Sequence, residues 1–232
     1  LQFGENEDLS TYPQPFEADA KLCESEGVDF IFHPKNLYPE HGLQVGLHAN
    51  QLSNYLCGNT RPGHFDGVVT VVNILFNIVQ PQIAIFGEKD FQQVSIIRRL
   101  VSDLYLPVEI IEGETVREAD GLAKSSRNRY LNTEQRQLAA QISACLKNIQ
   151  KAAEQSSDLN HILEIGHQHL NRFGIQPDYL LICSEYSLEP TSSLDTDEPL
   201  RIFIAATIGP ARLIDNMPLY PILHDKDQTP CA

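Results

Sequence analysis

The stretch that decides the fold spans residues 83 to 94 and reads Ile83-Ala84-Ile85-Phe86-Gly87-Glu88-Lys89-Asp90-Phe91-Gln92-Gln93-Val94. Its first four residues are all apolar, which is typical of a central strand in a parallel sheet. Gly87 ends this strand, and Asp90 is expected to cap a helix with apolar residues on one face as far as Leu104. A second apolar strand is expected at Val108 to Ile111. This strand–helix–strand order, with its short connections, indicates an α/β fold with a doubly wound sheet.

The residues before this stretch predict further elements of the same unit. Residues 17–26 form an expected helix that Gly27 ends, and residues 28–32 form an expected strand that stops at a His-Pro pair. Residues 50–56 are expected to form a short helix closed by Gly58. Residues 68–79 are apolar on nearly every side and are too long for an ordinary strand, which predicts a buried helix ending before Pro81.

The character of the chain changes after Asn132, where a smaller α+β unit is expected. Its predicted elements are two amphipathic helices followed by two strands, at residues 133–155, 158–172, 176–187 and 200–208. A loop rich in Arg, Ser, Asp and Gly, residues 114–130, is expected to link the two units. We therefore divide the chain into a nucleotide-binding domain, 1–115, a smaller C-terminal lid domain, 116–219, and a tail, 220–232.

Charge and cysteine content narrow the function classes. The chain has 232 residues, 42% of them hydrophobic, and carries 17 basic against 31 acidic residues, a net charge of −14. Such an acidic chain is a poor candidate for broad binding to nucleic acid or to an anionic membrane. No apolar run is long enough for a membrane span, and no signal peptide is visible. The five cysteines are scattered, without a C-x-x-C pair, which argues against disulfides or zinc and predicts a reducing, cytoplasmic setting.

The segment Gly87 to Asp90 is the first candidate for chemistry. It lies where a strand ends and a helix begins, which is where α/β sheets hold nucleotides against a helix N-terminus. Glycine lets a ligand approach the backbone, and Lys89 supplies a mobile positive charge for phosphate. The alternative is a plain capped turn with a solvated lysine, and these four residues taken alone favour that alternative.

A second candidate is the loop from Arg117 to Tyr130, which has four cations and two adjacent serines. Serine hydroxyls can donate to phosphate oxygens, and Arg127 can neutralise charge on departing pyrophosphate. The alternative is a solvated linker, but paired serines between cations favour triphosphate binding.

Arg61 and His64 follow a turn-rich stretch just before the buried helix. Arg61 has the forked geometry that suits a carboxylate, whereas the spacing of His64 alone favours a helix-capping or core role. Among the glutamines, Gln2, Gln92 and Gln93 carry amides that suit a hydroxy acid, although helix glutamines are usually just exposed.

These segments, taken in order, resemble the pantothenate synthetase (pantoate–β-alanine ligase) family over nearly the whole chain, fading after about Leu219. The matching stretches are Leu1–Gly4 with Asp8 and Tyr12-Pro13, Arg61–Val72, Phe86–Gln93, Val116–Ala123, Ser125–Leu131, Ile208-Gly209 and Arg212–Asn216. The resemblance implies a Rossmann-like nucleotidyltransferase domain with a smaller C-terminal domain. It also implies an ATP-dependent ligase that uses Mg²⁺ with ATP, forms pantoyl adenylate and pyrophosphate, and then transfers the pantoyl group to β-alanine with release of AMP. A homodimer is implied as well.

The resemblance also implies roles for individual residues. ATP is expected to contact Gly87, Glu88, Lys89, Asp90, Val116, Lys124, Ser125, Ser126 and Arg127, of which Lys89, Ser125, Ser126 and Arg127 are the catalytic candidates. Pantoate is expected to contact Gln2, Gln93, Arg61 and His64, and β-alanine is expected to contact Gln2 and Tyr12. Catalysis by holding reactants and neutralising phosphate charge agrees with a chain that offers cations and amides but no evident nucleophile.

Two departures from the family pattern stand out. Lys124 occupies a position where many relatives have methionine, so it adds a cation that is either exposed or in contact with phosphate. The family's first strand and its histidine-containing loop are expected upstream of Leu1, so we expect this N-terminally truncated chain to be inactive or impaired. Two alternatives stay open: an adenylate-forming enzyme for another hydroxy acid, and a nucleotide-binding remnant without catalysis.

Overall fold

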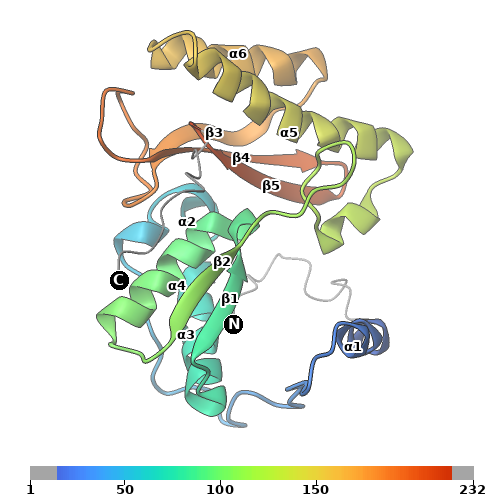
Figure 1. Ribbon diagram of the computed structural model, residues 1–232, viewed down its shortest axis with the longest axis vertical. Coiled ribbons are helices and arrows are strands. Elements are labelled where there is room, and N and C mark those ends of the chain that lie inside the picture. The colour runs from blue at the N-terminus through green and yellow to red at the C-terminus, as the bar shows by residue number, and fades with distance from the viewer. Residues whose placement is uncertain (1–14, 221–232) are drawn as a thin grey trace, which may run out of the picture.

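The computed structural model describes residues 15–220, which form two sheets with helices packed on them (Figure 1). A parallel sheet of β1 (Ile83–Gly87) and β2 (Glu109–Gly113) lies with α3 (His64–Val79) and α4 (Phe91–Asp103) in the lower half of the view. An antiparallel sheet lies above it, covered by two long helices. The α/β fold class and the smaller second unit are thus confirmed, and their boundary in the chain stays a prediction.

The β1–α4–β2 unit has the predicted parallel pairing. Its register runs from Ile83 opposite Glu109 to Gly87 opposite Gly113, so both strands end at the same edge. The short helix η3 (Glu88–Asp90) joins β1 to α4 at that edge. The expectation that β1 is buried on both faces is wrong for the described residues, because Ile83 is 50% and Ile85 is 70% exposed.

Helix α3 confirms the long apolar helix predicted for residues 68–79, and it begins four residues earlier, at His64. Phe65, Val69 and Phe76 are buried against α4, where Ile97 and Leu100 complete the contact. This packing fixes the N-terminal ends of both helices beside the edge where the parallel strands end.

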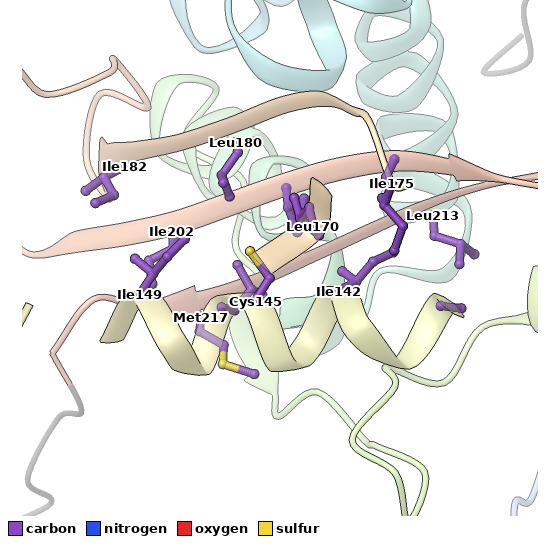
Figure 2. Packing of buried hydrophobic residues seen from close by; sticks show 14 of the residues in the cluster. Ile142, Cys145, Ile149, Leu170, Ile175, Leu180, Ile182, Ile202, Leu213 and Met217 are labelled. Atoms are coloured by element: carbon purple, nitrogen blue, oxygen red, sulfur yellow. The ribbon is translucent and has the colours of Figure 1, made fainter. Parts of the chain in front are cut away.

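The second unit contains α5 (Thr133–Ala153), α6 (Leu159–Arg172) and the strands β3 (Pro177–Ser184), β4 (Leu200–Ile208) and β5 (Ala211–Pro218). The strand order is β3-β4-β5, and all pairing is antiparallel. Asn132 and Gln135 form a reciprocal capping box at the start of α5. Figure 2 shows side chains of α5 and α6, such as Ile142, Ile149 and Leu170, directed at the sheet and forming one apolar core. The predicted helices and strands are confirmed, and β5 is an additional strand.

The segment before α3 differs most from expectation. Helix α1 (Phe16–Ser25) is confirmed, but residues 28–32 form no strand. Phe30 is 92% exposed, and in the described chain no strand lies beside this segment to share its backbone hydrogen bonds. The single helix expected for residues 50–56 is wrong too. It is replaced by η2 (Gln51–Ser53) and α2 (Leu56–Thr60), and α2 continues through Gly58.

A small apolar cluster joins the two units behind the edge that carries η3. It contains Leu56 and Phe91 from the first unit with Cys183, Leu188 and Phe203 from the second. The rings of Phe91 and Phe203 are 5.9 Å apart between centroids, in a tilted arrangement. This contact holds the start of α4 against the antiparallel sheet. Within residues 15–220, no helix is both long and apolar enough to cross a membrane.

Candidate active site

A cleft lies where the ends of the parallel strands meet the antiparallel sheet. It is lined from the first unit by Leu56, Cys57, Arg61, His64, Phe65, Lys89, Asp90, Phe91, Gln92 and Gln93, and from the second by Tyr179, Phe203, Ile214, Asp215 and Asn216. Six of the polar residues singled out in the sequence therefore line the cleft from the first unit: Arg61, His64, Lys89, Asp90, Gln92 and Gln93. Both units contribute to the cleft, so its shape depends on how they pack.

The turn between α2 and α3 brings Arg61 and His64 together. Gly63 has a φ of +76°, a left-handed conformation that glycine adopts without strain, and His64 begins α3 directly after it. The Nη1 of Arg61 lies 2.8 Å from the Nε2 of His64. A guanidinium can only donate, so Nε2 accepts and the imidazole is neutral with its proton on Nδ1. His64 therefore lines the cleft while paired with Arg61, and its role in binding a ligand stays a prediction.

The segment from Gly87 to Asp90 forms the turn predicted from the sequence. The side chain of Lys89 is only 20% exposed, and its ammonium nitrogen lies 3.7 Å from the Oδ2 of Asp90, a distance too long for a strong charge-assisted hydrogen bond. Asp90 occupies the cap position of α4, but its side chain makes no capping hydrogen bond, so the predicted cap is wrong. An ammonium held in a cleft and loosely paired is well suited to receive phosphate oxygens.

The two adjacent glutamines of α4 have different surroundings. Gln92 is buried, and its amide accepts from the backbone N–H of Cys57 at 3.0 Å and donates to the carbonyls of Leu52 and Tyr55 at 2.8 Å. All of its hydrogen-bonding groups are thus used to anchor the segment before α3. Gln93 is half-buried and lines the cleft, so it is the glutamine that can meet a ligand.

The serine–arginine loop and the lysine turn both pack against the same strand, β5. Ser126 begins the short helix η4 (Ser126–Tyr130), and β5 contacts both η3 and η4. The hydroxyl of Ser125 accepts from the backbone N–H of Arg127 at 3.3 Å, which leaves its own proton free to donate. Lys124 is exposed. These residues do not line the cleft itself, but they lie beside the strand that forms its wall.

Arg117 departs from the expectation that the loop's four cations meet a triphosphate. Its guanidinium holds the carboxylate of Asp215 in a bidentate pair, with Nη1 to Oδ2 at 2.7 Å and Nη2 to Oδ1 at 2.9 Å. Because Asp215 is buried and needs this partner, Arg117 has a structural role. Arg98, Arg99 and Arg136 are also paired, with Glu112, Asp103 and Asp120 respectively.

Strand β5 supplies cleft residues whose function the sequence did not suggest. Asp215 and Asn216 belong to a matched stretch, but two adjacent polar residues do not suggest a buried strand. Gly209 is the sequence signal that could have predicted the β4–β5 hairpin, because the turn there has a φ of +55°. Tyr179 also lines the cleft, where burial raises the pKa of its phenol well above the usual range. The phenol therefore stays neutral and can only form hydrogen bonds, such as its 3.2 Å contact with the Sγ of Cys57.

The remaining candidates lie away from the cleft or outside the described residues. Val116 is 62% exposed, and its carbonyl accepts from the backbone N–H of Lys124 at 2.9 Å. Gln2 and Tyr12 lie outside residues 15–220. Within that range no group of three acidic, histidine or cysteine residues could hold a metal ion.

Comparisons with known proteins agree on one family. The model of the family described as pantoate-beta-alanine ligase matches residues 1–218. A pantothenate synthetase from Thermotoga petrophila is 48% identical over 221 residues, which are 93% of this chain and 77% of that protein. One from Shewanella sediminis is 44% identical over 220 residues, covering 94% and 78%.

Solved structures give the same result. The crystal structure of pantothenate synthetase from Thermus thermophilus superposes with a TM-score of 0.90 at 41% identity, covering 95% of this chain and 80% of that one. Pantoate-beta-alanine ligase from Francisella tularensis, complexed with beta-gamma ATP and beta-alanine, gives 0.75 at 32% identity, covering 94% and 75%.

Proposed function

The chain belongs to the pantoate–β-alanine ligase family and is an ATP-dependent ligase of pantoate and β-alanine, and we propose that its reaction passes through a pantoyl adenylate. The observation that supports this most is the cleft wall where Arg61, His64, Lys89 and Gln93 come together. It offers cations and an amide for an anionic hydroxy acid and a polyphosphate. These groups support catalysis by binding and charge neutralisation.

In the first step, a carboxylate oxygen of pantoate attacks the α-phosphorus of ATP. The bond to the bridging oxygen of the β-phosphate breaks, and pyrophosphate leaves with the electron pair. Lys89 neutralises charge on the phosphates, and Ser126 and Arg127 approach them from the η4 side. Ser125, the exposed Lys124 and the backbone of Gly87 to Asp90 complete the phosphate contacts, and Val116 lies toward the adenine.

In the second step, the amine of β-alanine attacks the acyl carbon of the adenylate. The carbon–oxygen bond to AMP breaks, and the amine loses a proton as the amide forms. Gln93 binds the hydroxyl of pantoate, while Arg61 and neutral His64 face its carboxylate end. Gln2 and Tyr12 are proposed for β-alanine.

Magnesium enters this proposal together with ATP. The described residues hold no cluster of metal ligands, and Mg²⁺ commonly binds through substrate phosphates with one or two carboxylates. Asp90 lines the cleft and is 49% exposed, whereas Asp215 is held by Arg117, so Asp90 is the better carboxylate for the ion. The ion supplies further charge neutralisation at the phosphates. A homodimer and a cytoplasmic location stay predictions, and sedimentation and cell fractionation test them.

The adenylate route is tested with pantoate labelled with ¹⁸O in its carboxylate. Mass spectrometry of the products should find one ¹⁸O in AMP and one fewer in pantothenate than in pantoate. Label in inorganic phosphate would mean attack at the γ-phosphorus and would overturn the proposal. The assay is run on this 232-residue chain, and full turnover by the chain would contradict the expected impairment.

A further inference from the structure

The side-chain amide of Asn216 connects the antiparallel sheet to the lysine turn. Its Nδ2 donates to the carbonyl oxygens of Glu88 and Lys89, each at 3.0 Å, and its Oδ1 accepts from the Nη1 of Arg201 at 2.7 Å. The reverse orientation of the amide would place oxygen against two carbonyls and nitrogen against a guanidinium, so the orientation is fixed. Asn216 and Arg201 are each 4% exposed. The backbone of the lysine turn is therefore held by a buried amide that is itself held in place.

The preceding residue, Asp215, makes the matching connection to the serine–arginine loop. Its carboxylate is held by Arg117, and its Oδ1 also accepts from the backbone N–H of Asn216 at 2.8 Å. Arg117 donates to the carbonyl of Gly121 at 3.1 Å and pairs across a bridge with Ala123, one residue before Lys124. Arg117 thus fixes the turn from which the serine–arginine loop continues.

Two neighbouring residues of one strand therefore hold the two segments to which the proposed function assigns the phosphates. We propose that Asp215 and Asn216 are positioning residues that keep the Lys89 turn and the Ser125–Arg127 loop in a common register for ATP. This inference rests on the proposed function for the identity of the two segments. It goes beyond that function because it assigns positioning roles to two buried residues of the sheet, which act through the backbone segments that they hold.

Energetics favour a positioning role over simple packing. Buried ion pairs and amides are weak sources of net stability, and apolar side chains of similar volume often stabilise a core as well or better. Here the polar groups are directed at carbonyls of a turn that apolar side chains could not hold. Reacting groups displaced by about 1 Å lose on the order of 100-fold in rate, so a turn freed from Asn216 should bind and align ATP poorly.

The test uses two substitutions of Asn216 and a matched control on a neighbouring helix. Asn216→Ala removes both donors. Asn216→Asp keeps the shape and places its charge beside Arg201, but turns an oxygen toward the two carbonyls. The control, Gln150→Ala, removes an amide that donates to the carbonyl of Pro218 at 2.6 Å, at the C-terminal end of the same strand, rather than to the lysine turn. ATP affinity is measured by calorimetry, KM and kcat are measured for ATP and for β-alanine, and Tm is measured for all variants.

Both Asn216 variants should lose at least 10-fold in ATP affinity and in kcat/KM for ATP, while KM for β-alanine stays within about threefold of the wild-type value. Gln150→Ala should lower Tm with ATP affinity unchanged. ATP affinity within twofold of wild type in either folded Asn216 variant, together with a lowered Tm, would mean a purely structural role and would overturn the inference. Wild-type protein that binds ATP and consumes it with labelled pantoate, but transfers no ¹⁸O to AMP, would contradict the proposed reaction alone. Wild-type protein that fails to bind ATP would overturn both.

Discussion

Replacing Lys89 by methionine removes the ammonium from the cleft and keeps the length of the side chain. In the free protein this charge contributes little to stability. Its contact with Asp90 at 3.7 Å would be worth about 4 kcal/mol at an effective dielectric constant of about 20. Asp90 is half exposed, however, and ion pairs of this kind contribute about 0–1 kcal/mol to the free energy of unfolding because water screens them. We therefore expect Lys89→Met to unfold within about 1 kcal/mol of the wild type.

The same substitution should weaken ATP binding strongly. A hydrogen bond to a charged group contributes about 1.5–3 kcal/mol, and 1.4 kcal/mol corresponds to a factor of ten in affinity. Calorimetric titration should therefore give an ATP dissociation constant about 10- to 100-fold higher for Lys89→Met. Lys151→Met, on the exposed side of α5, is the matched control and should bind ATP like the wild type. An ATP affinity within twofold of the wild type in Lys89→Met would show that Lys89 does not bind the phosphates of ATP.

Three further substitutions or conditions give separate expectations. Gly87 has a φ of −76° and nothing within 4 Å of where a Cβ would lie, so Gly87→Ala should melt like the wild type. It should bind ATP several-fold more weakly if phosphate approaches this backbone as proposed, and normal ATP affinity by calorimetry would contradict this. A Cβ on Gly166 would lie 2.6 Å from the Cδ1 of Ile149, so Gly166→Ala should cost about 1–3 kcal/mol and lower Tm by several degrees in thermal melts; an unchanged Tm would show that the core adapts. Burial raises the pKa of Cys145 and of Cys183 from 9.0 to about 12. Between these values the folded state keeps thiol protons that the unfolded state loses. The free energy of unfolding should therefore be unaffected by these thiols below pH 9 and should fall as the pH rises toward 12. Denaturant titrations should show that decline, which a variant with both cysteines replaced by alanine should show less.

The fold of the central unit could be predicted because local signals and tertiary pairing agree there. Residues 83–86 are apolar, Gly87 interrupts them, and the next apolar face repeats at helical spacing, so sequence alone predicts β1, α4 and β2 in order. The strand expected at residues 28–32 failed for the opposite reason. Its composition favours a strand, but a strand forms only where a neighbour accepts its hydrogen bonds, and within the described chain none does.

Local sequence patterns predict the cations proposed for the candidate site, but they do not predict the buried residues that hold these segments in place. A lysine after a strand and a serine–arginine loop are local patterns that point to phosphate. The partnership of Asn216 with the carbonyls of residues 88 and 89 joins positions more than 120 residues apart, and no local pattern carries that information. Likewise, Arg117 looked like a ligand in the sequence because its buried partner, Asp215, lies on a strand nearly 100 residues later.

A crystal structure with a non-hydrolysable ATP analogue tests most directly whether the two loops serve one nucleotide. We expect the ammonium of Lys89 and either the hydroxyl of Ser126 or the guanidinium of Arg127 to lie within about 3.5 Å of oxygens on the same polyphosphate chain. A nucleotide whose phosphates reach only one of the two loops, or one bound away from the cleft, would show that Lys89 and the η4 loop do not form a single phosphate site.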